Sequence, residues 1–128
     1  MGTPSPSSQI LCFGDFPEIL RFQLSQLRWE KIRYDQKDSA YQGNLRYASG
    51  CVTVNGLIYI TGGSMVSSGE ATNTCYEART NAPGRFSRKK SMLSKRYAHS
   101  CVNLNGYIYS LGGFDNRDAD GVAPNTLE

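Results

Sequence analysis

Residues 46–63 of this 128-residue chain have the sequence RYASGCVTVNGLIYITGG, and residues 96–113 repeat that stretch as RYAHSCVNLNGYIYSLGG. The offset is 96 − 46 = 50 residues, and eleven of the 18 paired positions are identical. A similarity at a fixed period of this size indicates one structural unit that is used more than once along a chain. Both copies should therefore adopt the same local structure.

Each copy predicts a β-hairpin. Residues 48–54 are expected to form its first strand, and Asn55-Gly56 is a strong turn signal because a type I′ turn needs positive φ at both central residues. Residues 57–61 form a nearly continuous apolar run, which fits a return strand buried on both faces. Gly62-Gly63 then ends the strand. The second copy carries the same signals in Asn105-Gly106 and Gly112-Gly113.

Further strands are expected between the hairpins. Residues 72–78 and 85–90 are predicted as the third and fourth strands of the complete copy, with a turn over residues 79–84. Residues 18–24 alternate apolar and polar side chains, which favours a strand, although helical spacing over residues 17–28 is a competing interpretation. Another strand is expected over residues 27–34. Residues 35–45 and 64–71 are predicted to be loops, the second of them flexible.

The repeat divides the chain into four segments. Residues 1–9 are Pro- and Ser-rich and are predicted to be a disordered lead. Residues 10–45 form a partial copy, because Ile10 to Asp15 stand where Ile58 to Gly63 stand later. Residues 46–95 are a complete repeat, and residues 96–128 are a second partial one. One such unit cannot bury both of its faces alone, so the terminal sheets should present open edges.

Four hairpin-connected strands in roughly 50 residues resemble the kelch repeat. Several residues carry the resemblance: the glycine pairs Gly62, Gly63, Gly112 and Gly113, the preceding Tyr59 and Tyr109, and the later aromatic residues Trp29 and Phe86. The linker over residues 91–100 is similar to the connection between kelch units. Phe86 replaces the usual Trp, Asp15 replaces a glycine, and the third strand lacks the common Tyr-Asp pair.

The resemblance implies an all-β fold of kelch-type β-propeller blades, each a four-stranded antiparallel sheet. The ring would be incomplete, with one full blade and two partial blades. Propellers typically have four to eight blades, so additional blades would have to come from a longer chain or from an oligomer. The large aromatic residue of the fourth strand, Trp29 or Phe86, is expected to fill the space between neighbouring sheets.

The function implied by the resemblance is that of a noncatalytic protein–protein interaction scaffold. In some kelch propellers an arginine before the first strand lines the mouth of the central channel and binds acidic peptide. Arg46 and Arg96 match that position, with Tyr47 and Tyr97 beside them, so these four residues are the predicted binding residues for an unknown protein partner with an acidic segment. The loops over residues 64–71 and 114–124 are further candidates. Two alternatives remain open: a fragment of a kelch-bladed enzyme, such as an oxidase or isomerase, or of a ubiquitin-ligase substrate receptor whose other domains are missing.

Composition argues against several other functions. A net charge of +3 lacks the concentrated basic face of a nucleic-acid binder, and the basic residues over 85–96 are expected to be solvated. The chain has one histidine, His99, and no Cys-x-x-Cys, so no zinc site, cofactor or catalytic residue is predicted. His99 is expected to be structural or incidental, and Cys51 and Cys101 to be buried core thiols. The Asp-rich segment 115–120 lacks EF-hand spacing.

No targeting segment is predicted either. The N-terminal residues have no apolar core of a signal peptide, and no apolar run approaches the 18 residues that a membrane-spanning helix requires. The sequence therefore predicts a soluble, cytoplasmic protein without membrane or nucleic-acid partners.

Overall fold

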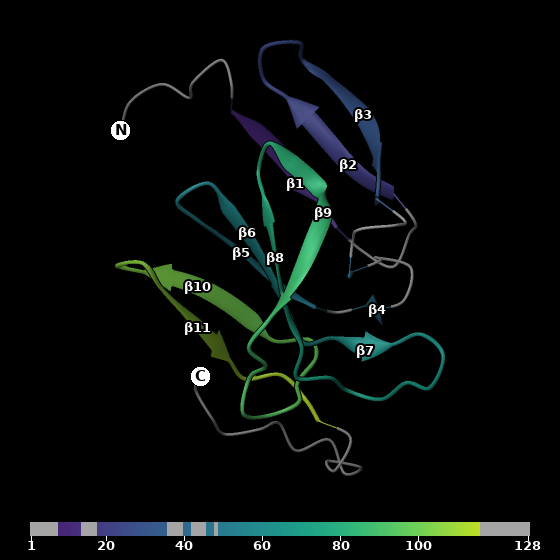
Figure 1. Ribbon diagram of the computed structural model, residues 1–128, viewed down its shortest axis with the longest axis vertical. Coiled ribbons are helices and arrows are strands. Elements are labelled where there is room, and N and C mark those ends of the chain that lie inside the picture. Colours follow the sequence, from purple (N-terminus) through teal and green to yellow (C-terminus); the bar gives the residue numbers. More distant parts are fainter. Residues whose placement is uncertain (1–7, 14–17, 36–39, 42–45, 48, 116–128) are drawn as a thin grey trace.

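The computed structural model describes residues 8–13, 18–35, 40–41, 46–47 and 49–115. Within these ranges the chain contains only β-strands and connections, and every strand pair is antiparallel. The three main sheets lie side by side in chain order (Figure 1). The all-β prediction is confirmed. The described part of the chain does not close into a barrel or a ring.

The middle sheet has four strands in the order β5-β6-β8-β9. Their bounds are Gly50–Val54, Leu57–Thr61, Cys75–Arg79 and Ala82–Lys89. The four predicted strands of the complete copy are all present in this sheet, but the predicted turn over residues 79–84 is too long. Only Thr80 and Asn81 separate β8 from β9. Pro83 is tolerated inside β9 because β9 is an edge strand, where a residue without an N–H group need not break a hydrogen-bonded ladder.

The first sheet has three strands, β1 (Gln9–Cys12), β2 (Glu18–Gln23) and β3 (Arg28–Arg33). The strand interpretation of residues 18–24 is confirmed, and the helical alternative is wrong. Alternation along β2 turns Ile19 into the core, where its side chain is fully buried. β1 already begins at Gln9, which the sequence had placed in the disordered lead; residues 1–7 lie outside the described ranges.

The third sheet is the hairpin of β10 (Ser100–Leu104) and β11 (Tyr107–Leu111). Its register is that of β5 and β6 moved by 50 residues: Gly50 pairs with Thr61, and Ser100 pairs with Leu111. Both predicted turns are confirmed, since φ is 49° and 79° in Asn55-Gly56 and 53° and 83° in Asn105-Gly106. The repeated sequence therefore forms a repeated structure.

A short fourth pairing repeats as well. β4 (Arg46–Tyr47) pairs with β7 (Ser64–Met65), and Tyr47 lies opposite Ser64. Fifty residues later Tyr97 forms the same kind of bridge with Phe114. In both copies, the residue that follows the glycine pair thus forms a β-bridge with the tyrosine that precedes the hairpin.

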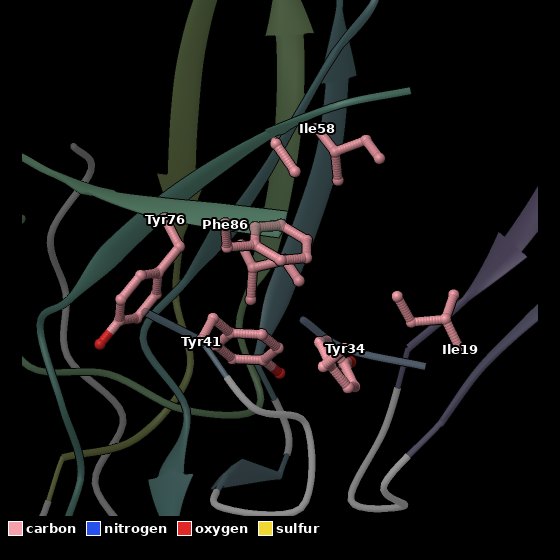
Figure 2. Packing of buried hydrophobic residues seen from close by; sticks show 8 residues of the cluster. Ile19, Tyr34, Tyr41, Ile58, Tyr76 and Phe86 are labelled. Atoms are coloured by element: carbon pink, nitrogen blue, oxygen red, sulfur yellow. The ribbon is translucent and has the colours of Figure 1, made fainter. Parts of the chain in front are cut away.

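The main hydrophobic core lies between the first and middle sheets (Figure 2). Aromatic rings dominate it: Phe86 contacts Tyr41 edge-to-face at a centroid distance of 5.3 Å and Phe13 at 5.8 Å. The buried cluster comprises Ile19, Tyr34, Tyr41, Ile58, Ile60, Tyr76, Ala78 and Phe86. Backbone hydrogen bonds join the two sheets at its margin, from the Asp35 N–H to the Gly84 carbonyl and from the Ala40 N–H to the Phe86 carbonyl.

The two predicted space-filling aromatic residues have different environments. Phe86 is fully buried between sheets, as expected. Trp29 is 53% exposed on the outer side of the first sheet, where it contacts Phe22 at a centroid distance of 5.2 Å. The expectation that Trp29 fills the space between two sheets is not met within the described structure, because no described sheet lies on that side.

No helix among the described residues is long and apolar enough to cross a membrane.

Candidate interaction site

The four predicted binding residues lie before the hairpins of the two repeat copies. The backbone of Arg46 and Tyr47 forms β4, but their side chains lie outside the part of the structure that is described. Tyr97 is half-buried, and its ring contacts Phe114 at a centroid distance of 5.8 Å. Binding through these residues stays a prediction.

Arg96 is the largest fully buried side chain of the described structure. Its Nη1 donates a hydrogen bond to the Gly112 carbonyl at 3.0 Å. Its backbone N–H donates to the Thr72 carbonyl, and its own carbonyl accepts from the Gly63 N–H at 2.9 Å. Arg96 therefore links the two repeat copies from within, and its guanidinium is not presented at the surface to a partner.

Gly62 allows this close approach of one repeat to the next, and Gly113 allows a similar approach within the second copy. A Cβ placed on Gly62 would lie 2.3 Å from the Arg96 carbonyl oxygen, and one on Gly113 would lie 2.5 Å from the Tyr97 carbonyl oxygen. Neither position tolerates a side chain without movement of the backbone. At Gly112, the counterpart of Gly62, a Cβ would meet no atom within 4 Å. The prediction that the glycines permit close contact thus holds for Gly62 and Gly113.

A polar network joins the middle and third sheets. The Thr61 hydroxyl lies 2.8 Å from His99 Nε2 and 3.0 Å from Cys101 Sγ, and Cys101 Sγ lies 3.4 Å from the Ser110 hydroxyl. His99 is only 8% exposed. A Cβ on Gly50 would fall 2.6 Å from both His99 and Cys101, so the first residue of β5 must be small. These contacts give His99 a structural role between sheets.

Sequence reasoning missed Thr61 and Ser110 as members of this network. A signal was present, because Thr61 replaces the apolar Leu111 of the other copy, and Ser110 replaces Ile60.

The expectation that Cys51 and Cys101 are buried core thiols is met only in part. Cys101 is half-buried beside Thr61, but Cys51 is exposed on the edge strand β5. All four cysteines are free thiols.

Tyr59 and Glu77 form a second polar contact on adjacent strands. The Tyr59 hydroxyl donates to Glu77 Oε2 at 2.6 Å. This hydrogen bond, together with partial desolvation, raises the pKa of Tyr59 to about 12. The carboxylate also lies 3.5 Å from Lys89 Nζ. Tyr59 was predicted as a structural residue, and its hydrogen bond across β6 and β8 agrees with that interpretation.

The loop over residues 64–71 is more ordered than predicted. Ser64 and Ala71 form a β-bridge at its base, and the Met65 N–H donates to the Glu70 carbonyl at 2.8 Å. The Gly69 N–H donates to the Met65 carbonyl at 2.7 Å. Residues 66–70 are exposed at the tip. Of the second predicted loop, residues 114–124, only Phe114 and the buried Asp115 lie within the described ranges.

A groove of about 610 Å³ opens between β3 of the first sheet and the β8–β9 turn of the middle sheet. Arg21, Ile32, Arg33, Asp35, Asn81, Ala82, Pro83, Gly84 and Arg85 line it. Arg21 forms an ion pair with Glu30 at 2.6 Å, and Arg85 forms one with Asp35 at 2.9 Å. Arg33 lines the groove with its carbonyl, which faces Gly84, while alternation along β3 points its exposed side chain to the same side as Trp29.

The sequence did not predict this groove, because its lining comes from strands of two different sheets. Arg21 lies on β2 and Arg85 on β9, and only the packing of one sheet against the other brings them together. Arg85 was placed in a solvated basic set; it is exposed, but it also forms the ion pair to Asp35 from the preceding sheet. Two guanidinium groups, each paired with a carboxylate, thus lie in one groove.

The described residues contain no group of three or more His, Cys, Asp or Glu side chains that could hold a metal ion. Of the Asp-rich segment, residues 116–120 lie outside the described ranges.

A comparison with protein-family models finds no match for this chain, and a comparison with curated proteins finds no significant match. The resemblance to the kelch repeat stays a prediction.

Proposed function

We propose that this chain is part of a kelch-type propeller and acts as a noncatalytic scaffold that binds an acidic protein segment. The observation that carries the proposal is the groove between β3 and β9, which Arg21 and Arg85 line together with Ile32 and Pro83. One four-stranded sheet, followed 50 residues later by a hairpin of the same register, supports the comparison with the kelch repeat. A groove between two such units is built from rigid strands, which suits recognition of an extended segment.

The chemistry of the groove fits carboxylates. Guanidinium groups bind carboxylates with two parallel hydrogen bonds, and Arg21 and Arg85 both line the groove. Arg21 and Arg85 are oriented by Glu30 and Asp35, which limits the side-chain entropy that binding would cost. Ile32 and Pro83 offer apolar contact between the charges. The expected ligand is an extended segment that alternates acidic and apolar residues.

Exposed ion pairs are individually weak and are screened by salt. Binding should therefore be moderate in strength and should decrease as ionic strength rises. The binding prediction for Arg46, Tyr47, Arg96 and Tyr97 is separate from this groove, since Arg96 is buried in the contact between the repeat copies.

The test uses fluorescence anisotropy with a labelled peptide of alternating Glu and Leu. A peptide with Lys in place of Glu serves as the charge control. Arg85→Glu should weaken binding of the acidic peptide by about tenfold or more, because it places a like charge in the groove. Lys95→Glu makes the same charge change on the exposed linker and should have little effect. Equal binding of both peptides, or equal losses in both variants, would overturn the proposal.

A further inference from the structure

The outer side of the first sheet carries an exposed apolar surface. Ile10 on β1, Phe22 on β2 and Trp29 on β3 lie in one row across the sheet, because Ile10 pairs with Phe22 and Phe22 pairs with Trp29. Leu20 lies on the same side, two residues from Phe22. Ile10 is 57% exposed and Trp29 is 53% exposed. We call these four residues the first outer face.

The third sheet carries a second exposed apolar surface at the opposite end of the stack (Figure 1). Val102 and Leu104 on β10 and Tyr107 and Leu111 on β11 point to the same side, and their exposed fractions range from 41% to 70%. The other side of this hairpin carries Cys101, which contacts Thr61 of the middle sheet. We call Val102, Leu104, Tyr107 and Leu111 the last outer face.

The repeat shows what covers the counterpart of the first outer face. In the middle sheet the corresponding row is Ile58 on β6, Ala78 on β8 and Phe86 on β9. All three side chains are buried in the core against the first sheet. In the middle sheet, the counterpart of the first outer face is therefore covered by the sheet that precedes it in the chain.

The counterpart of the last outer face is covered from the opposite direction. Val54 corresponds to Leu104 and Leu57 to Tyr107 at the offset of 50 residues. Val54 is buried and Leu57 is half-buried on the side of the middle sheet that faces the third sheet, where β10 lies against β5. This kind of face is one that a following sheet covers.

We infer that a second copy of this chain docks head-to-tail, with the last outer face of one copy on the first outer face of the other. The contact continues the stacking of sheets that already holds the first, middle and third sheets together. It would bury Trp29 and Tyr107, residue types that often anchor protein interfaces. Exposed apolar surfaces of this kind are typical of association sites.

The geometry of the contact sets the assembly. Because the two faces differ, the contact is heterologous, and such contacts close into rings when the rotation between copies permits. Two copies contribute 2 × 3 = 6 main sheets, a number within the range of known propellers. This inference concerns the ends of the stack and does not depend on peptide binding in the groove between β3 and β9.

Sedimentation equilibrium over a range of concentrations tests the inference. The wild-type chain should associate. Trp29→Lys and Tyr107→Lys should each lower the association constant by about a hundredfold or more, because each places a charge in an apolar contact. Leu93→Lys changes a linker residue that is 90% exposed and outside both faces, and it should associate like the wild type. Urea denaturation of the monomers checks that each variant is folded.

Mixing the two interface variants distinguishes head-to-tail docking from pairing of identical faces. The Trp29→Lys chain retains a normal last outer face, and the Tyr107→Lys chain retains a normal first outer face. An equimolar mixture should therefore form heterodimers, although neither variant associates alone. A wild-type chain that stays monomeric, association unaffected by either variant, or a mixture that stays monomeric would each overturn the inference.

Discussion

The middle and first sheets carry the same kind of face in two different environments. Ile58 and Phe86 of the middle sheet are fully buried, whereas their counterparts in the first sheet, Ile10 and Trp29, are more than half exposed. All four are apolar, and all four lie on strands with equivalent pairing. The difference shows that the repeat determines which side chains point to a given face, while a neighbouring sheet determines whether that face is buried.

The largest expected effect contrasts Phe86 with Trp29. Phe86→Ala should lower the free energy of unfolding by about 3–5 kcal/mol, because it leaves a cavity in the aromatic core. Trp29→Ala in the monomer should cost less than about 1 kcal/mol, since the ring is half exposed. Urea denaturation at concentrations where the chain is monomeric measures both values. Equal costs would show that the two faces are equally covered.

The glycine pairs give the next contrast, between Gly62 and Gly112. Both have positive φ, 59° and 69°, so alanine should cost about 1 kcal/mol at either position. At Gly62 the new Cβ would also collide with the Arg96 carbonyl, which should raise the total to about 3 kcal/mol. Thermal or urea denaturation of Gly62→Ala and Gly112→Ala makes the comparison. A cost at Gly112 as large as at Gly62 would contradict the open surroundings of Gly112.

The polar contact between the middle and third sheets should have a smaller effect. Thr61→Val removes the hydroxyl that lies between His99 and Cys101, and it should cost about 1–3 kcal/mol because a buried ring nitrogen loses a hydrogen-bond partner. Thr53→Val changes an exposed residue of β5 in the same way and serves as the matched control. Denaturation curves in which both variants match the wild type would exclude a stabilising role for this contact.

The smallest expected effect depends on pH. The hydrogen bond to Glu77 raises the pKa of Tyr59 to about 12, above the value of about 10 in an unfolded chain. The folded state therefore holds this proton more tightly, so the contribution to stability is complete below pH 10 and is lost as pH rises from 10 to 12. Tyr59→Phe should reduce the fall in stability over this interval. Thermal or urea denaturation at several pH values between 9 and 12 measures this difference.

Much of the fold follows from local sequence. Asn55-Gly56 and Asn105-Gly106 predicted both hairpins, because few residues other than Asn and Gly adopt positive φ at low cost. Alternation predicted β2, although helical spacing was also compatible with it. The start of β9 was misplaced, because Pro83 and Gly84 resemble a turn until the edge position of the strand is known.

The candidate site was less accessible to sequence reasoning. Arg96 was expected at the surface from its place before the hairpin, yet its side chain is buried and bonded to Gly112. The groove arginines come from strands of two sheets, and no spacing along the chain reveals that Arg21 and Arg85 line one surface. Thr61 and Ser110 could have been suspected because they interrupt apolar positions of the repeat.

By itself, the sequence determined the repeat, the hairpins, the all-β class and the apolar face of each strand. These properties depend on backbone preference and on alternation, which act over a few residues. Only the tertiary structure decided which faces are covered, that Arg96 is inside, and that Arg21 and Arg85 share a groove. Burial depends on which sheet lies against which, and that relation joins residues too far apart in the chain for a local pattern to encode it.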